Sequence, residues 1–324
     1  MSPSPTASAP LEVLLEPDAL NDALAHDATE GLGSRPYTLP PKYFYDERGS
    51  ALFEDITRLP EYYPTRAERA LLDEHAGEIV ATSQADVLLE LGSGSSEKTS
   101  VLLDAFGAAL RAYVPVDVSP SALQGAVDEL AVERPDLPVL GVVADFDRHL
   151  PDLPRPGRRL VAFLGGTIGN LDQAQRAGFL ATLQASLAPG ETVLLGVDLV
   201  KDPERLVAAY DDTAGVTAEF NLNVLRVLSR ELDADLDPAD FEHVALWNPD
   251  DERIEMRLRA RRPLTARLGA LGLEIELEQD EEIRTEISSK FRRERIEAEL
   301  TAQGLDPSGW WTDGDYALVL AVRQ

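Results

Sequence analysis

Short apolar runs alternate with amphipathic stretches along the first part of the chain. The clearest run covers residues 87–91 and is interrupted only by Glu90 before it stops at the glycine turn Gly92-Ser93-Gly94. This run predicts a buried strand followed by a sharp turn. From Leu102 to Leu110 the apolar residues recur at helical spacing, which predicts a helix shortly after the turn. The unit is therefore a strand, a glycine turn and a helix.

Further apolar runs, each followed by a helical pattern, repeat this unit along the chain. They lie in the segments AYVPVD, PVLGVVADF, RRLVAFLGG and ETVLLGVDLV. Such an alternation predicts a parallel sheet covered by helices, because parallel neighbours need a crossover connection. The expected fold class is α/β, with a doubly wound, Rossmann-like sheet.

The pattern changes after Asp202-Pro203. Residues 203–230 have helical spacing, whereas residues 241–290 alternate with period two. The alternation predicts an antiparallel hairpin with at least one further strand, and hence a second, smaller α+β domain. A helix near Glu294–Gln303 and strands in the segment GWWTDGDYALVLAVRQ would then complete the first sheet.

These patterns predict the division of the chain into domains. We expect a disordered lead in residues 1–14, which are rich in Ser, Pro and Ala at their start, and a helical pattern from Leu11 to about Leu32. The large domain would consist of residues 66–201 and 292–324. The smaller, substrate-binding domain would consist of residues 15–65 and 202–291.

Much of the aromatic content lies in the arm that precedes the first strand. Prolines fix the backbone around it. One interpretation is an aromatic cluster that packs this arm on the domain, and we favour it for most of the rings. The other is a lid over a substrate pocket, for which one or two tyrosines would suffice. The rings are those of Tyr37, Tyr43, Phe44, Tyr45, Phe53, Tyr62 and Tyr63.

The composition narrows the classes of partner. The 324 residues include 58 acidic and 30 basic side chains, which gives a formal charge of −28. A surface so negative repels nucleic acid and anionic membranes, and we expect neither as a partner. The chain has no cysteine, which rules out disulfides, thiolate nucleophiles and zinc–thiolate sites.

The histidines and the N-terminal segment narrow the classes further. His26, His75, His149 and His243 lack the spacing of metal ligands, so no metal site is expected. The segment MSPSPTASAP lacks the basic start and apolar core of a secretion signal, and no apolar run is long enough to span a bilayer. We therefore expect a soluble, cytoplasmic protein. We also expect a monomer, although none of these patterns determines the oligomeric state.

Three classes of ligand could use the glycine turn, and Glu97 helps to separate them. A dinucleotide-binding G-x-G-x-x-G loop and a phosphate-binding P-loop both need a glycine where Glu97 stands. A carboxylate at this place would also repel phosphates. S-adenosylmethionine carries no phosphate, and Lys98 could pair with its carboxylate. A glycine turn without any ligand is the plain structural alternative.

Acidic residues end the second and third predicted strands. Asp117 is placed to accept hydrogen bonds from both ribose hydroxyls, as acids do in dinucleotide folds. Asp145 could accept the amino group of adenine, and Phe146 could cover the base. Each acid alone is also explained as a helix cap. Asn170 follows the fourth strand, at the place where a second substrate would meet the first if the strand order reverses there.

Six segments spread over the chain carry a family resemblance: ELGSGSSEKT, FLGGTIGNL, GVDLVKD, LPEYYPTR, ERIEMRLRA and TEISSKFR. They resemble the class I S-adenosylmethionine-dependent methyltransferases, and more closely the L-histidine Nα-methyltransferase family of ergothioneine biosynthesis. The resemblance covers nearly the whole chain, including the smaller domain. It implies trimethylation of the α-amino group of histidine to hercynine.

The resemblance also implies roles for individual residues. The methyl donor would be held by Gly92, Lys98, Asp117, Asp145 and Phe146. Histidine would be held by Tyr62, Asn170, Tyr210, Met256, Glu286, Ile287 and Ser288. Of these, Asn170 and Tyr210 would orient the carboxylate of histidine, and Glu286 with Ser288 would bind the imidazole. Tyr45 would assist catalysis.

The chemistry of imidazole agrees with this implication. Imidazole offers one N–H donor and one acceptor, so a carboxylate and a hydroxyl match both nitrogens. Such a pair also rejects apolar amino acids, which would leave it unsatisfied. Without the resemblance, Glu286 in the acidic run DEEIRTEIS would be interpreted as an exposed strand acid. Tyr43 stands where we expect tryptophan, which is a conservative change.

We expect the neutral α-amine to attack the sulfonium methyl group in line, three times. A free α-amine titrates near 8 in model peptides, so losing its proton costs only about 1–2 kcal/mol and needs no strong base. Alignment of the reactants would contribute most. Two alternatives stay open: an N-methyltransferase for another free amino acid, and a non-catalytic S-adenosylmethionine-binding sensor.

Overall fold

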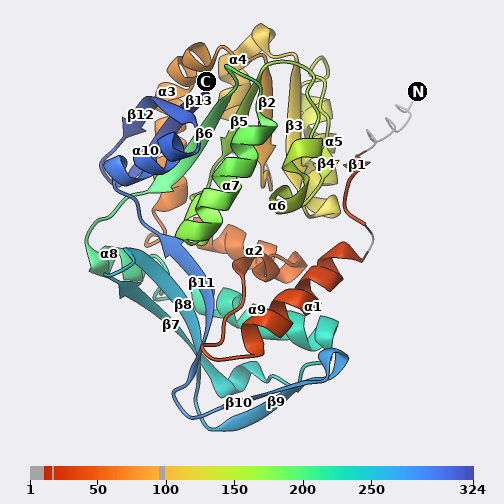
Figure 1. Ribbon diagram of the computed structural model, residues 1–324, viewed down its shortest axis with the longest axis vertical. Helices are drawn as coiled ribbons and strands as arrows, with labels where there is room; N and C mark the ends of the chain where they lie inside the picture. The colour runs from red at the N-terminus through yellow and green to blue at the C-terminus, as the bar shows by residue number, and fades with distance from the viewer. Residues whose placement is uncertain (1–10, 17, 95–98) are drawn as a thin grey trace.

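A mixed β-sheet with helices on both faces forms the upper lobe in Figure 1. The computed structural model describes residues 11–16, 18–94 and 99–324. The strands of this sheet are β1 (Glu12–Val13), β2 (Val87–Leu91), β3 (Ala112–Asp117), β4 (Val142–Val143), β5 (Arg159–Phe163), β6 (Thr192–Asp198), β12 (Leu305–Thr312) and β13 (Tyr316–Arg323). Their order over the described residues is β1-β4-β3-β2-β5-β6-β13-β12. Neighbours run parallel except at β13, which is antiparallel to β6 and β12.

Successive side chains of each central strand cover opposite faces of this sheet. Leu88 shares a buried cluster with α3 (Pro64–Ser83) and α4 (Ser100–Phe106). Leu89 shares another with α7 (Gln173–Ser186) and α10 (Arg293–Ala302). Burial on both faces explains the continuous apolar runs and confirms the predicted doubly wound sheet. The other helices of this lobe are α5 (Pro120–Glu133), α6 (Phe146–His149) and the 3-10 helices η2 (Gly107–Ala109), η3 (Leu150–Asp152) and η4 (Thr167–Asn170).

The second lobe contains a three-stranded antiparallel sheet and a separate hairpin. The sheet has the order β11 (Glu282–Ser289), β8 (Arg253–Ala260), β7 (Phe241–Asn248), and the hairpin pairs β9 (Leu264–Leu268) with β10 (Leu273–Leu277). These strands confirm the antiparallel pairing predicted for residues 241–290. The helices are α1 (Ala19–Leu32), α2 (Glu47–Thr57), α8 (Pro203–Ala208), α9 (Val216–Leu232), η1 (Pro41–Phe44), η5 (Pro238–Asp240) and η6 (Gly269–Leu271). One buried apolar cluster joins these strands and helices.

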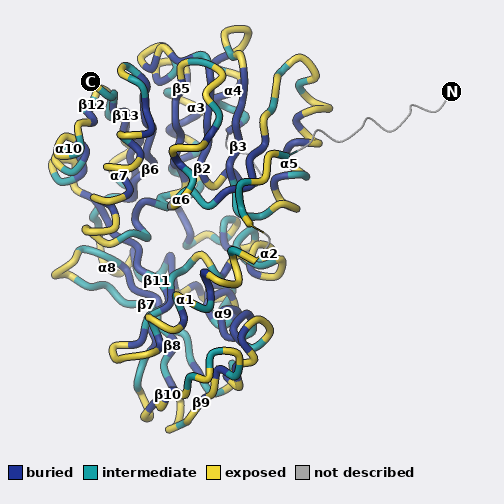
Figure 2. Tube along the Cα trace, turned by 45° about the vertical axis from the view of Figure 1, so that its right-hand side comes forward, coloured by how far each residue is buried: buried dark blue, intermediate teal, exposed yellow. Residues whose placement is uncertain are grey.

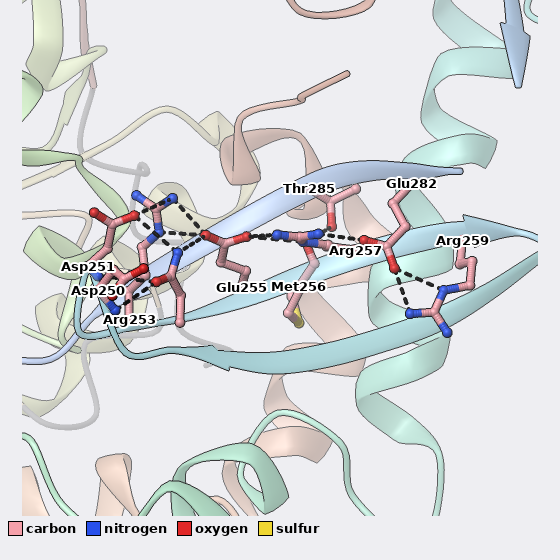
Figure 3. A network of polar contacts seen from close by, with 10 residues as sticks. Asp250, Asp251, Arg253, Glu255, Met256, Arg257, Arg259, Glu282 and Thr285 are labelled. Atoms are coloured by element: carbon pink, nitrogen blue, oxygen red, sulfur yellow. Dashed lines mark hydrogen bonds and ion pairs between the residues drawn. The ribbon is translucent and has the colours of Figure 1, made fainter. Parts of the chain in front are cut away.

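The face of β8 opposite this cluster carries a row of ion pairs, which Figure 3 shows. Glu255 pairs with Arg253 and Arg257, and Arg257 also pairs with Glu282 of β11. Burial alone would raise the pKa of Glu255, but hydrogen bonds, led by that from Arg257, lower it to about 2. Met256 points the other way and is buried. The sheet therefore has a charged outer face and an apolar inner face.

Two segments differ from the sequence-based expectation. Residues 11–14, expected in a disordered lead, contain β1, which pairs in parallel with β4. The rest of the expected lead, residues 1–10, lies outside the described residues. The single helical stretch expected over residues 203–230 is two helices, because Asp212 accepts hydrogen bonds from the N–H groups of Val216 and Thr217 and starts α9 anew.

The central sheet is more deeply buried than the far end of the second lobe. Figure 2 shows the middle strands of the large sheet buried along most of their length, whereas the β9–β10 hairpin has exposed positions that alternate with buried ones. None of the described helices combines the length and the apolar character needed to cross a membrane.

Candidate functional site

The two lobes meet where the C-terminal end of β11 lies against η4, which follows β5, and where the next residues meet the carboxyl end of β6. We call this region the junction and define it as residues 169–170, 198–201 and 286–291. The backbone N–H of Phe291 donates to the carbonyl of Asp198 over 2.8 Å. Gly169 in η4 faces β11 so closely that a Cβ there would lie 2.9 Å from the carbonyl oxygen of Ser289. The edge of the sheet where α/β folds bind ligands therefore adjoins β11.

The glycine turn after β2 has an open geometry. Gly92 and Gly94 have φ values of 68° and 50°, and a Cβ on either residue would meet no atom within 4 Å. At the end of β3, the carboxylate of Asp117 accepts hydrogen bonds from the N–H groups of Gly94 (3.0 Å) and Ser119 (2.9 Å). Asp117 therefore shapes the turn. Lys98, also predicted to bind the methyl donor, lies outside the described residues.

Asp145 and Phe146 follow β4 at the same edge of the sheet. The ring of Phe146 lies 5.3 Å from that of Phe163 and 6.0 Å from that of Phe179, between centroids, which fixes its orientation. Both Asp145 and Phe146 are half-buried. The pKa of Tyr43, in the other lobe, is raised chiefly by burial, and the charge of Asp145 adds to this rise. Tyr43 therefore lies close to this edge.

A β-bulge in β11 decides which side chains face inward. Glu286 pairs with Met256 after a shift of register that leaves Thr285 without a cross-strand partner. In an uninterrupted strand, Glu286 would share the charged outer face with Arg284. The bulge instead turns Glu286 and Ser288 to the inner face, together with Met256.

The other predicted histidine-binding residues take different places. Ile287 pairs with Glu255, so its side chain lies on the outer face, and only its backbone lies beside Glu286 and Ser288. Asn170 ends η4 and is half-buried at the junction.

The carboxylate of Glu286 is half-buried, and within the described part of the chain no group forms a hydrogen bond with it. Burial raises its pKa from 4.5 to about 7, although the charge of Lys290 opposes the rise. Burial also raises the pKa values of Tyr45, Tyr62 and Tyr210, and the charge of Glu286 adds to each rise. The three predicted tyrosines therefore surround this carboxylate.

These tyrosines belong to a connected set of aromatic rings. The Tyr45 ring meets those of Phe53 and Phe220 edge-on, with centroids 5.4 Å apart in both cases. The Tyr62 ring lies 6.2 Å from Phe53 and 6.3 Å from Tyr210. Tyr62 and Tyr210 are buried, but Tyr45 is 40% exposed. Most rings of the N-terminal arm thus form a packed cluster, and Tyr45 is the exposed ring among them.

A buried lysine joins the two predicted hydroxyls of the site. The hydroxyl oxygens of Tyr210 and Ser288 lie 2.7 Å apart. The ammonium group of Lys290 donates to Tyr210 (3.0 Å) and to Ser288 (2.8 Å), and it pairs with Asp198 at 2.8 Å. The hydroxyl of Tyr63 donates to the carboxylate of Asp198.

Sequence reasoning missed Lys290 and Asp198. They belong to different lobes, and only the fold brings them together. The available signals were the position of Asp198 at the carboxyl end of a predicted strand, within GVDLVKD, and the presence of Lys290 in the segment TEISSKFR. Over residues 11–16, 18–94 and 99–324, no acidic or histidine side chains are grouped so as to hold a metal ion.

A chain of buried hydrogen bonds supports the bulge. The hydroxyl of Thr285 lies 2.6 Å from Oδ1 of Asn221, and Nδ2 of Asn221 lies 2.8 Å from Nδ1 of His243. Nε2 of His243 lies 2.8 Å from the carbonyl oxygen of Tyr210. Burial lowers the pKa of His243, so the neutral ring accepts from Asn221 and donates to Tyr210. The bulge and the backbone of Tyr210 are therefore linked.

Known proteins of one family are similar to this chain over most of its length. The family model for histidine-specific, S-adenosylmethionine-dependent methyltransferases matches residues 24–323. The histidine N-alpha-methyltransferase of Mycolicibacterium smegmatis is 54% identical over 313 residues, which cover 95% of this chain and 98% of that protein. The protein of the same name from Mycobacterium tuberculosis is 51% identical, over 94% and 97% of the two chains. Ergothioneine biosynthesis protein 1 of Neurospora crassa is 30% identical over 89% of this chain and 33% of its own length.

Proposed function

The chain belongs to the family of S-adenosylmethionine-dependent, histidine-specific methyltransferases, and from this premise we propose that it methylates the α-nitrogen of L-histidine three times to give hercynine, in the first step of ergothioneine biosynthesis. S-adenosylmethionine is the methyl donor and histidine the substrate. The observation that carries the proposal is the half-buried carboxylate of Glu286, which lacks a partner among the described residues and lies beside the Ser288 hydroxyl at the junction.

When bound, S-adenosylmethionine supplies an electrophilic methyl group on its sulfonium. The described residues fit such a ligand, because the glycine turn is open and a half-buried acid stands at the end of β3 and another just after β4. Gly92 and Lys98 would hold the amino acid end of the donor. Asp117 would accept the ribose hydroxyls. Asp145 and Phe146 would hold the adenine.

Histidine would lie between Glu286 and the edge of the sheet. Glu286 accepts the ring N–H and Ser288 binds the other ring nitrogen. Asn170 and Tyr210 orient the substrate carboxylate, and Tyr62 packs against the substrate. Met256 lies on the same face of the sheet as Glu286 and would line the site on the side of β8. The backbone of Ile287 lies between the two imidazole-binding residues.

Tyr45 would act on the α-amine through its hydroxyl. Tyr45 is 40% exposed, so its burial is partial, but this burial and the charge of Glu286 both raise the pKa of Tyr45. Its hydroxyl therefore keeps its hydrogen near neutral pH and is not a strong base. It can accept a hydrogen bond from the neutral amine and orient the lone pair. The neighbouring aromatic faces favour the cation that grows with each methyl transfer.

The division of labour between the lobes is part of the proposal. Residues 66–201 and 292–324 would bind the donor, and residues 15–65 and 202–291 would bind histidine. We also propose that the protein acts as a cytoplasmic monomer without nucleic acid or membrane partners. The formal charge of −28 supports the absence of both polyanionic partners.

Mass spectrometry tests the proposed function. Histidine incubated with the protein and S-adenosylmethionine should give species with one, two and three added methyl groups, and a panel of other free amino acids should give far less product. Preferential methylation of another amino acid would reassign the substrate. Tight donor binding without any methylated product would indicate a sensor.

A further inference from the structure

We propose that Lys290, held by Asp198, fixes the direction of the hydrogen bonds around Ser288, so that the Ser288 hydroxyl donates to the ring nitrogen of histidine that carries no hydrogen. Lys290 and Asp198 are then positioning residues that contribute to the selection of imidazole. The inference rests on the proposed function, because it requires the histidine ring to lie at Glu286 and Ser288.

The ammonium group of Lys290 uses all its hydrogens on neighbouring side chains. It has three N–H groups and meets three acceptors: Asp198 at 2.8 Å, Ser288 at 2.8 Å and Tyr210 at 3.0 Å. The side chain of Lys290 is 0% exposed, so water does not compete. An ammonium group cannot accept a hydrogen bond. Both hydroxyl oxygens must therefore accept from it.

The remaining hydrogens can be counted. Tyr210 and Ser288 carry one hydroxyl hydrogen each, and one of these is used in the 2.7 Å contact between their oxygens. When Tyr210 donates, the Ser288 oxygen accepts from both Tyr210 and Lys290, and it can offer only its own hydrogen. The opposite direction would use the Ser288 hydrogen on Tyr210. With Tyr210 as the donor, that hydrogen is free for one nitrogen of a ring whose other nitrogen meets Glu286, which lies beside Ser288 on the same face of β11.

This polarity matches neutral imidazole. Glu286 accepts the ring N–H while Ser288 donates to the bare nitrogen. A ring that has an N–H but no bare nitrogen would leave the Ser288 hydrogen unpaired, and a buried unpaired donor weakens binding strongly. In this arrangement Tyr210 gives its hydrogen to Ser288, so it contacts the substrate carboxylate without donating to it. The amide of Asn170 is then the donor for the substrate carboxylate.

Asp198 anchors the lysine to the large sheet. Burial alone would lower the pKa of Lys290, but the charge of Asp198 outweighs it and holds this pKa above the ordinary value. Asp198 is the last residue of β6, and its backbone carbonyl also accepts the N–H of Phe291. On its other side, Lys201 and Tyr63 form hydrogen bonds with its carboxylate. The lysine is thus charged and fixed before a substrate arrives.

Substitution of the lysine tests the inference. Lys290→Met keeps an unbranched side chain that is one atom shorter and removes its donors. The readouts are KM for histidine, Kd for S-adenosylmethionine, and the ratio of kcat/KM for histidine to that for 3-(pyrrol-2-yl)alanine, whose ring has an N–H but no bare nitrogen. We expect this ratio to fall at least about tenfold and KM for histidine to rise at least about tenfold. The donor Kd should change by less than about twofold.

Two further variants calibrate the result. Ser288→Ala should lower the same ratio. The double variant of Lys290→Met and Ser288→Ala should lower it little further than either single variant, because both substitutions remove the same interaction with the ring. Arg159→Met removes a comparably buried ion pair, with Glu191, at the opposite end of β5. It should lower the melting temperature and leave the ratio unchanged.

An unchanged ratio in folded Lys290→Met protein would overturn the inference, as would an equal loss of donor and histidine binding. If Lys290→Met does not fold, Asp198→Asn retains the side-chain shape, removes the charge and replaces one acceptor oxygen by an amide donor. It should lower the ratio in the same direction, and an unchanged ratio in this variant would count equally against the inference. Failure of the proposed function is distinguishable, because the unaltered protein would then give no methylated histidine.

Discussion

Among individual side chains, Glu286 shows most clearly how stability and function diverge. A half-buried acid without a partner favours its protonated form, and burial therefore raises its pKa from 4.5 to about 7. The folded chain then binds a proton more tightly than the unfolded chain does. The free energy of unfolding falls as the pH rises from about 4.5 to about 7 and remains lower above that range.

Glu286→Gln should stabilise the fold at pH 8 and have little effect at pH 4.5. Glutamine keeps the shape of the side chain and removes the charge that burial disfavours, and the gain at the higher pH should be about 1–3 kcal/mol, given that the group keeps some contact with water. Urea denaturation at the two pH values measures the difference. Destabilisation at pH 8 would mean that a protein group holds the carboxylate.

The same substitution should weaken histidine binding at least about tenfold, because the ring N–H loses a charged acceptor. Donor affinity should not change, since Glu286 lies on β11 and not on the strands that would hold the donor. Calorimetry with each ligand separates the two effects. Equal losses for both ligands would reject the proposed role of Glu286.

Substitution of Asp117 should have the opposite effect and weaken binding of the donor instead of histidine. Its carboxylate holds the N–H of Gly94 and is proposed to accept the ribose hydroxyls, so Asp117→Ala should weaken donor binding at least about tenfold. Asp117→Asn keeps one acceptor oxygen, and its donor affinity should lie between those of the unaltered protein and Asp117→Ala. Donor titrations followed by calorimetry test this order. An unchanged donor Kd in Asp117→Ala would show that the ribose assignment is wrong.

Among the secondary-structure elements, the bulged strand β11 has the largest effect on the site. Thr285 is the extra residue of the bulge, and its hydroxyl lies 2.6 Å from the buried amide oxygen of Asn221. Thr285→Val removes this hydrogen bond and leaves a buried acceptor unpaired, which should lower the free energy of unfolding by about 1–3 kcal/mol.

KM for histidine should also rise about three- to tenfold in Thr285→Val, because Glu286 follows the bulge directly. Thr285→Ser retains the hydroxyl and is the matched control. Urea denaturation together with steady-state kinetics measures both changes. Unchanged histidine kinetics in a destabilised Thr285→Val protein would show that the bulge supports the fold and not the site.

This bulge also marks the limit of prediction from the sequence. The alternation of apolar runs with helical patterns was sufficient for the doubly wound sheet, because each strand is buried on both faces. In residues 282–289, however, the period-two rule places Glu286 on the outer face, and a bulge cannot be seen in the alternation alone. Only the family resemblance indicated that Glu286 belongs to the site.

The predicted and missed site residues differ in their separation along the chain. Gly92 and Asp117 stand at strand ends, where local patterns predict a ligand. Lys290 and Asp198 acquire their roles only when the two lobes meet, so no local signal identifies the pair. The short strand β1 was missed for a similar reason, because it depends on its pairing with β4.

At the scale of the whole molecule, the formal charge of −28 should affect the binding of charged and of nearly neutral ligands differently. S-adenosylmethionine carries a net positive charge at neutral pH, whereas histidine and S-adenosylhomocysteine are close to neutral. A negative surface attracts the donor and has little effect on the others.

Raising the salt concentration from about 20 mM to about 500 mM should therefore weaken S-adenosylmethionine binding about two- to fivefold, because salt screens the attraction. The affinity for S-adenosylhomocysteine, which lacks the sulfonium charge, should stay nearly constant and serves as the control. Titrations at the two salt concentrations measure the difference. A parallel loss for both ligands would exclude long-range attraction as the cause.

The position of β13 between β6 and β12 has a consequence for biosynthesis of the protein. The glycine turn and the parallel strands β2 to β6 are translated early and can begin to fold together. Asp198, however, ends a strand whose outer neighbour is β13, and residues 316–323 emerge from the ribosome much later. A growing chain can therefore shape the turn proposed to bind the donor well before it completes the proposed site for the amino acid.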